Sequence, residues 1–143
     1  MPKPNPTPTP TPDPVVPTDL DEALLKLHNG QRNNSSPLVI NAQLEAAAVQ
    51  HVQWMAANNN MSHQQGRLTV ADRAKAAGYN WSYVGENIAE GYVDVNAVFK
   101  GWMGSAGHRA NIVNRNYKDV GFGMAKSANG SLYWCAVFGR SGN

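Results

Sequence analysis

Charged residues are scarce in this sequence of 143 residues. They make up 15% of the chain, against roughly 25% in an ordinary globular protein. Lysine and arginine number 12 and aspartate and glutamate 10, and neither group forms a run. So weak a field lacks the basic surface with which nucleic-acid-binding proteins neutralise phosphates. We therefore expect no nucleic-acid partner.

Cysteine pairs and long hydrophobic runs are also missing. Cys135 is the only cysteine, so no disulfide can form within the chain. No stretch approaches the roughly 18 apolar residues of a membrane-spanning helix. Met1-Pro2-Lys3 leads directly into prolines without the apolar segment of a signal peptide, and we interpret the methionine as replacing upstream sequence. Composition alone therefore predicts a soluble, compact protein with no transmembrane segment.

Prolines are concentrated at the N-terminus, where residues 2–17 hold eight of the nine. Repeated Thr-Pro units favour extended polyproline II geometry and cannot form a regular hydrogen-bonded ladder. We assign residues 1–17 to a disordered linker or stalk that tethers the protein, with a plain disordered tail as an equal alternative. Residues 18–143 form one domain, which is long enough to close a hydrophobic core without metal or disulfides.

Four helices are predicted from capping residues followed by apolar residues at helical spacing. Two of the helices open with a Thr-x-x-Asp capping box, and two follow a single Asn or Asp cap. The caps are Thr18 with Asp21, Asn41, Thr69 with Asp72, and Asp94. The first helix should end near Arg32 and the third at Gly78, and the fourth should cover residues 95–103.

Three segments alternate as strands do: residues 83–89, 120–125 and 132–140. Both faces of 132–140 are apolar, which predicts that helices cover both faces. One face of 120–125 carries only Gly121, Gly123 and Ala125, so a helix can pack closely against it. The pattern predicts an α+β fold, a three-layer α-β-α sandwich with a small antiparallel sheet between helices.

Five short motifs follow one another between Leu20 and Gly139. They are His28-Asn29 with Arg32; Met61-Ser62-His63; Gly85-Glu86-Asn87-Ile88; Trp102 followed by Ser105-Ala106-Gly107-His108-Arg109-Ala110-Asn111-Ile112; and Val120-Gly121-Phe122-Gly123 with Trp134 and Phe138-Gly139. In this order they resemble the CAP superfamily of cysteine-rich secretory, antigen 5 and pathogenesis-related proteins. The resemblance implies the CAP fold and a secreted, short microbial-type member. Because the disulfides and the appended cysteine-rich module of many eukaryotic members are absent, it implies no role at ion channels.

His63, Glu86 and His108 are the candidate site. His63 lies among polar residues and His108 follows a small-residue turn, while Glu86 lies on a strand where an unpaired carboxylate is costly. Two imidazoles and a carboxylate suit Zn²⁺ or another divalent metal and leave a position for water or a ligand. The alternative is a hydrogen-bonded cluster that only braces a cleft. The resemblance favours the metal site, although the position of the family's second acid is Ser105 here.

Other polar residues have weaker claims to function. Arg109 is a candidate to orient an anionic ligand, with a structural salt bridge as an equal alternative, and Ser105 is a second candidate ligand contact. His28, His51 and Cys135 should be buried and structural. Asn87 and Asn111 should hold the motif loops through backbone hydrogen bonds.

Three functions fit these features. The first is a secreted module, monomeric or weakly dimeric, that binds a small lipid, sterol or peptide in extracellular or host–microbe interaction. The second is a metal-dependent hydrolase in which Glu86 is a ligand or general base. No HExxH helix and no nucleophile with an acid–base partner supports catalysis, so binding is favoured. The third is a wall- or matrix-attached adhesion module positioned by residues 1–17.

Overall fold

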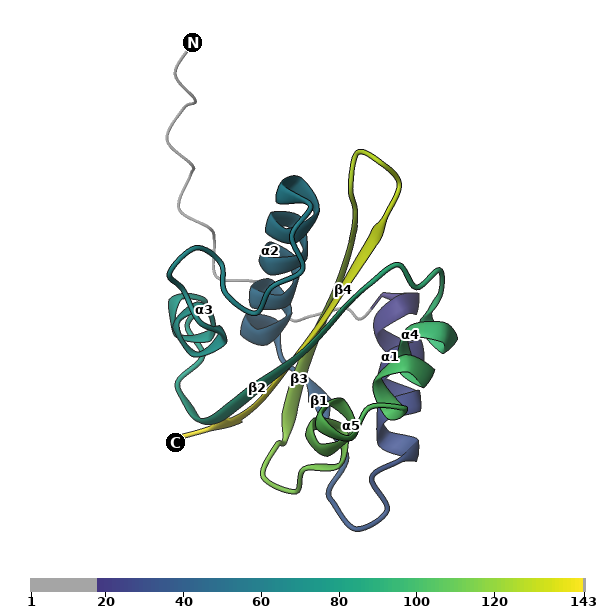
Figure 1. The fold of residues 1–143 in the computed structure, drawn as a ribbon. Helices are drawn as coiled ribbons and strands as arrows, with labels where there is room; N and C mark the ends of the chain where they lie inside the picture. The colour runs from purple at the N-terminus through teal and green to yellow at the C-terminus, as the bar shows by residue number, and fades with distance from the viewer. Residues whose placement is uncertain (1–17, 143) are drawn as a thin grey trace.

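The computed structural model describes residues 18–142, which form five helices and a four-stranded sheet (Figure 1). In chain order the elements are α1 (Asp19–Gly30), β1 (Val39–Ile40), α2 (Ala42–Asn58), α3 (Val70–Ala76), β2 (Trp81–Glu90), α4 (Val95–Met103), α5 (Ala106–Val113), β3 (Asp119–Lys126) and β4 (Leu132–Ser141). The expected stalk of residues 1–17 lies outside the described residues. Within the described part, no helix has the length and apolarity that a membrane span requires.

The strands lie in the order β1-β3-β4-β2. The three long strands are antiparallel, with β4 between β3 and β2. This central position explains why both faces of β4 are apolar. The short β1 adds a parallel pair, with Val39 opposite Asp119 and Ile40 opposite Val120. The sequence does not predict β1 because two residues are too few to show alternation.

Helices cover both faces of the sheet. α2 and α3 lie on one face, and α1, α4 and α5 lie on the other (Figure 1). Each face buries its own apolar core: Leu24, Trp102 and Phe138 lie on the side of α1, α4 and α5, and Met55 and Val137 lie on the side of α2 and α3. The predicted α-β-α sandwich is confirmed.

The predicted helix caps are confirmed, and one helix was missed. Both Thr-x-x-Asp capping boxes form, and the side chains of Asn41 and Asp94 accept hydrogen bonds from the first turns of α2 and α4. α1 ends at Gly30, slightly before the expected Arg32. α5 replaces the expected small-residue turn before His108. Its N-cap is Ser105, which makes no side-chain capping bond, and the small residues Ala106 and Gly107 that follow are interpreted as a turn from the sequence alone.

The close packing of α2 on β3 depends on two glycines. A Cβ on Gly121 would fall less than 3.0 Å from backbone atoms of Leu44 and Glu45. A Cβ on Gly123 would fall equally close to the carbonyl group of Ala48. The predicted close approach of a helix to this glycine face is therefore confirmed.

Candidate functional site

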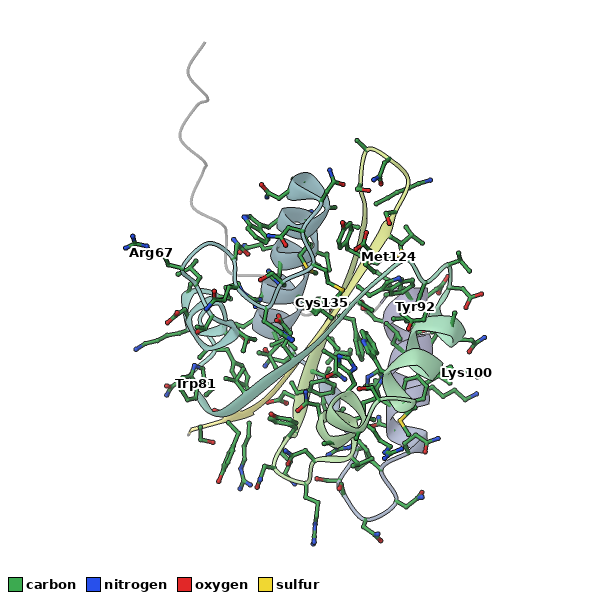
Figure 2. All side chains as sticks on the ribbon, in the orientation of Figure 1. Arg67, Trp81, Tyr92, Lys100, Met124 and Cys135 are labelled. Atoms are coloured by element: carbon green, nitrogen blue, oxygen red, sulfur yellow. The ribbon has the colours of Figure 1, made fainter. Side chains whose placement is uncertain are left out.

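The centre of the site is Glu86, in the middle of β2. Its side chain is 1% exposed, and side chains from four other segments surround it. Nδ1 of His63 lies 2.9 Å from Oε1, and Nη2 of Arg73 lies 3.0 Å from Oε1 and 2.8 Å from Oε2. The thiol of Cys135 donates to Oε2 at 3.3 Å, and Nε2 of His51 lies 4.0 Å from Oε1. Figure 2 shows Cys135 near the middle of the sheet, and it is buried together with Glu86, His51 and Arg73.

These partners keep the Glu86 carboxylate charged. Burial alone would raise the pKa of Glu86, because a carboxylate is less stable away from water. The hydrogen bond from His63 and the positive charge of Arg73 outweigh burial and lower that pKa below its usual value. A buried charge with such partners is a fixed acceptor at neutral pH.

His63 projects from the loop between α2 and α3, and its side chain is 58% exposed. Because Nδ1 is the atom that faces Glu86, the neutral ring carries its proton on Nδ1 and its lone pair on Nε2. Two buried side chains hold this loop in place. Nη2 of Arg73 donates to the His63 carbonyl at 2.7 Å, and Nε2 of His51 donates to the Ser62 carbonyl at 2.6 Å. Nε2 of His63 has no protein partner among residues 18–142 and is available for a ligand.

His108 reaches the same region from the first turn of α5. Nδ2 of Asn87 donates to the His108 carbonyl at 3.0 Å. Nδ2 of Asn111 donates to Oδ1 of Asn87 at 2.9 Å and to the Glu86 carbonyl at 3.3 Å. Both asparagines therefore hold α5 against β2, as predicted. Burial, and then the charge of His63, lower the pKa of His108.

The three predicted site residues thus occupy one region in different roles. His63 is hydrogen-bonded to Glu86, and the His108 carbonyl accepts from Asn87, the residue that follows Glu86. Both Glu86 oxygens already accept from Arg73, His63 or Cys135. Among residues 18–142, no group of three or more His, Cys, Asp or Glu side chains is arranged to hold a metal ion. The metal site formed by His63, Glu86 and His108 therefore stays a prediction.

Arg73 is the contact residue that sequence reasoning missed. Its side chain is 4% exposed, and its Nε and Nη1 have no protein partner in the described part of the chain. It occupies the apolar stripe of α3 with Val70, Ala74 and Ala77, where a basic residue needs a buried acceptor. A basic residue within an apolar stripe was therefore the sequence signal that could have identified Arg73.

The remaining predicted residues lie as follows. His51 and Cys135 are buried as expected, but both also contact the Glu86 carboxylate. Arg109 is exposed and donates from Nη1 to the Met103 carbonyl at 3.4 Å, and Ser105 occupies the N-cap position of α5 without a side-chain capping bond. The proposed roles of Arg109 and Ser105 in ligand binding stay predictions.

The family assignment follows from comparison with known proteins. The CAP model, "Cysteine-rich secretory protein family", matches residues 25–138. The chain belongs to this family. The uncharacterised protein YkwD of Bacillus subtilis is 32% identical over 123 residues, which are 84% of this chain and 47% of YkwD. This CAP chain therefore spans about half the length of that relative.

Two solved structures share the CAP architecture. An extracellular protein of Bacillus anthracis that contains an SCP domain superposes with a TM-score of 0.74 and 29% identity, covering 84% of this chain and 40% of that one. An outer surface protein of Borrelia burgdorferi superposes with a TM-score of 0.75 and 20% identity, covering 87% of this chain and 96% of that one. The second likeness concerns the fold alone.

Proposed function

We propose that this CAP domain is an extracellular binding module that holds a divalent cation between His63 and His108. The observation that carries the proposal is the 2.9 Å contact between Nδ1 of His63 and the buried Glu86. It leaves the Nε2 lone pair of an exposed ring free for a ligand. The extracellular and outer-surface descriptions of two proteins with the same fold support the location.

The donor chemistry favours zinc among divalent cations. Two neutral imidazoles suit zinc, and the remaining positions are open to water or a ligand. Histidine ligands of metals are commonly held by a carboxylate on their other ring nitrogen, which fixes the tautomer. Glu86 has this relation to His63, and Arg73 holds Glu86 in turn.

Binding is better supported than hydrolysis. A general base must reach the water or substrate proton that it removes. The Glu86 side chain is 1% exposed and its oxygens already accept three donor side chains. The contacts that allow Glu86 to hold His63 therefore also shield the Glu86 carboxylate from solvent.

Zinc titration by calorimetry at pH 7.5 tests the proposal. The native protein should bind one zinc ion, and His63→Ala, His108→Ala and the double variant should bind it at least about tenfold more weakly. Glu86→Gln should weaken binding by roughly 10-fold or more, because the tautomer of His63 is no longer fixed. The affinity of the native protein should fall below about pH 6, where imidazoles protonate.

Gln64→Ala is the matched control, since Gln64 is an exposed neighbour of His63 in the same loop. Circular dichroism should show every variant folded. Zinc affinity that is unchanged in the His63→Ala/His108→Ala double variant would exclude the site. So would affinity that is independent of pH between 5 and 7.5.

A further inference from the structure

A cavity of about 200 Å³ lies next to His108, which forms part of its wall. Its other walls are mainly apolar and come from the loop after α2, from β2 and from α4. They include Met61, Ile88, Tyr92, Gly101 and Trp102. Figure 2 shows Tyr92 just beyond the end of β2, beside α4. A ligand bound in the cavity would therefore also reach His108.

The aromatic walls are held in place by contacts inside the protein. The Tyr92 ring lies against Gly101, where an added Cβ would fall less than 3.0 Å from the phenol ring. The indole nitrogen of Trp102 donates to the Ile88 carbonyl at 3.1 Å, and that of Trp134 donates to the Tyr92 carbonyl at 2.9 Å. Because both indole N–H groups are used inside the protein, these walls present mainly carbon to a ligand.

The volume restricts which apolar group can enter. Sites for drug-sized ligands usually exceed roughly 300 Å³, so a sterol does not fit a cavity of about 200 Å³. The interior beyond the cavity, on the α1 and α4 side of the sheet, is filled by side chains of the core. Leu24, Val98 and Phe99 belong to it and are at most 7% exposed. The apolar group that enters must therefore be short.

The polar groups at the cavity favour a peptide over a fatty acid. His108 and the exposed Glu90 both form part of the cavity wall. Glu90 also accepts a hydrogen bond from the Ser131 hydroxyl at 3.1 Å. A carboxylate such as Glu90 attracts N–H donors and repels acids. Amide groups supply N–H donors for Glu90 and carbonyl oxygens for a cation held by the histidines.

We propose that this cavity binds one hydrophobic side chain of a peptide whose adjoining backbone contacts the histidine pair. The backbone contact in this inference rests on the proposed function, because it runs through the cation. The binding of the hydrophobic side chain rests only on the cavity. The ligand class is thereby reduced from lipid, sterol or peptide to a peptide with one apolar anchor.

Binding of three small probes, followed by NMR with and without zinc, tests the inference. The probes are N-acetylphenylalanine methylamide, N-acetylglycine methylamide and hexanoate. The phenylalanine probe should bind at least about tenfold more tightly than the glycine probe. It should also shift the Met61 methyl and Tyr92 ring signals. Tyr92→Ala and Met61→Ala should remove the preference, and Tyr83→Ala, an exposed tyrosine outside the cavity, should retain it.

The outcomes separate the two proposals. Equal binding of the phenylalanine and glycine probes to zinc-loaded protein would overturn the cavity proposal and leave the cation site intact. Hexanoate binding more tightly than the phenylalanine probe would overturn the peptide assignment in favour of a short acyl group. A phenylalanine preference in a protein that does not bind zinc would support the cavity and overturn the cation site.

Discussion

Nη2 of Arg73 lies 2.8 Å from Oε2 of Glu86, and both side chains are at most 4% exposed. An ion pair so far from water is costly to form but more costly to break, because removal of one partner leaves the other charge buried without compensation. Arg73 also donates to the His63 carbonyl. The stability of the fold and the position of His63 therefore depend on one guanidinium group.

Arg73→Met should lower the free energy of unfolding by about 3 kcal/mol or more, the usual cost of leaving a buried charge unpaired. Urea denaturation at pH 7 measures this loss. Arg73→Met/Glu86→Gln should recover part of it, because the unpaired carboxylate is then also removed. A double variant less stable than Arg73→Met would contradict the argument.

The helices and strands that the sequence predicts correctly are those whose signals lie within a few neighbouring residues. A capping box or a strand with two apolar faces is complete within a few residues, so Thr18 with Asp21 and residues 132–140 could be interpreted correctly. The role of Arg73 could not, because its partner lies 13 residues further on and meets it only when α3 packs against β2. Two elements were missed: β1 is only two residues long, and α5 begins with the small residues Ala106 and Gly107, which are interpreted as a turn from the sequence alone.

His28 should make the protein less stable in acid. Burial among Phe99, Trp102, Phe122 and Phe138 lowers the pKa of His28 to about 4. In the unfolded chain histidine titrates near ~6.5. As the pH falls from about 6.5 to 4, the unfolded chain binds a proton that the folded protein does not, so stability falls by about 3 kcal/mol.

His28→Phe should remove that part of the pH dependence. Urea denaturation of both proteins at pH 7, 5.5 and 4 compares the slopes, so a constant stability offset from the lost hydrogen bond to the Leu24 carbonyl does not matter. If the variant loses stability in acid as steeply as the native protein, His28 is not the cause.

Glu45 should have the opposite pH dependence. It lies against Asp21, and its Oε1 accepts from the Phe122 amide. Burial, followed by the contact with Asp21, raises the pKa of Glu45 to about 8. Between pH 4.5 and 8 the folded protein retains a proton that the unfolded chain releases, so this group makes the protein less stable as the pH rises.

Glu45→Gln tests this directly, since an amide can donate to Asp21 and accept from Phe122 at any pH. The variant should be more stable than the native protein at pH 8.5 and should differ less from it at pH 5. Glu22→Gln, an exposed acid in the first turn of α1, is the control and should leave the slope unchanged. A difference that shrinks as the pH rises would refute the assignment.

Two glycine substitutions should have opposite effects on stability. In Gly121→Ala the added methyl would fall onto the backbone of Leu44 and Glu45, which a rigid helix cannot move aside. We expect thermal unfolding to show a loss of about 2 kcal/mol or more, because overpacked backbone contacts must shift. In Gly107→Ala, in the first turn of α5, nothing lies within 4 Å of the added Cβ. Alanine there should gain about 0.5 kcal/mol through its higher helix propensity. Equal effects of the two changes would show that α2 does not pack on β3 as closely as described.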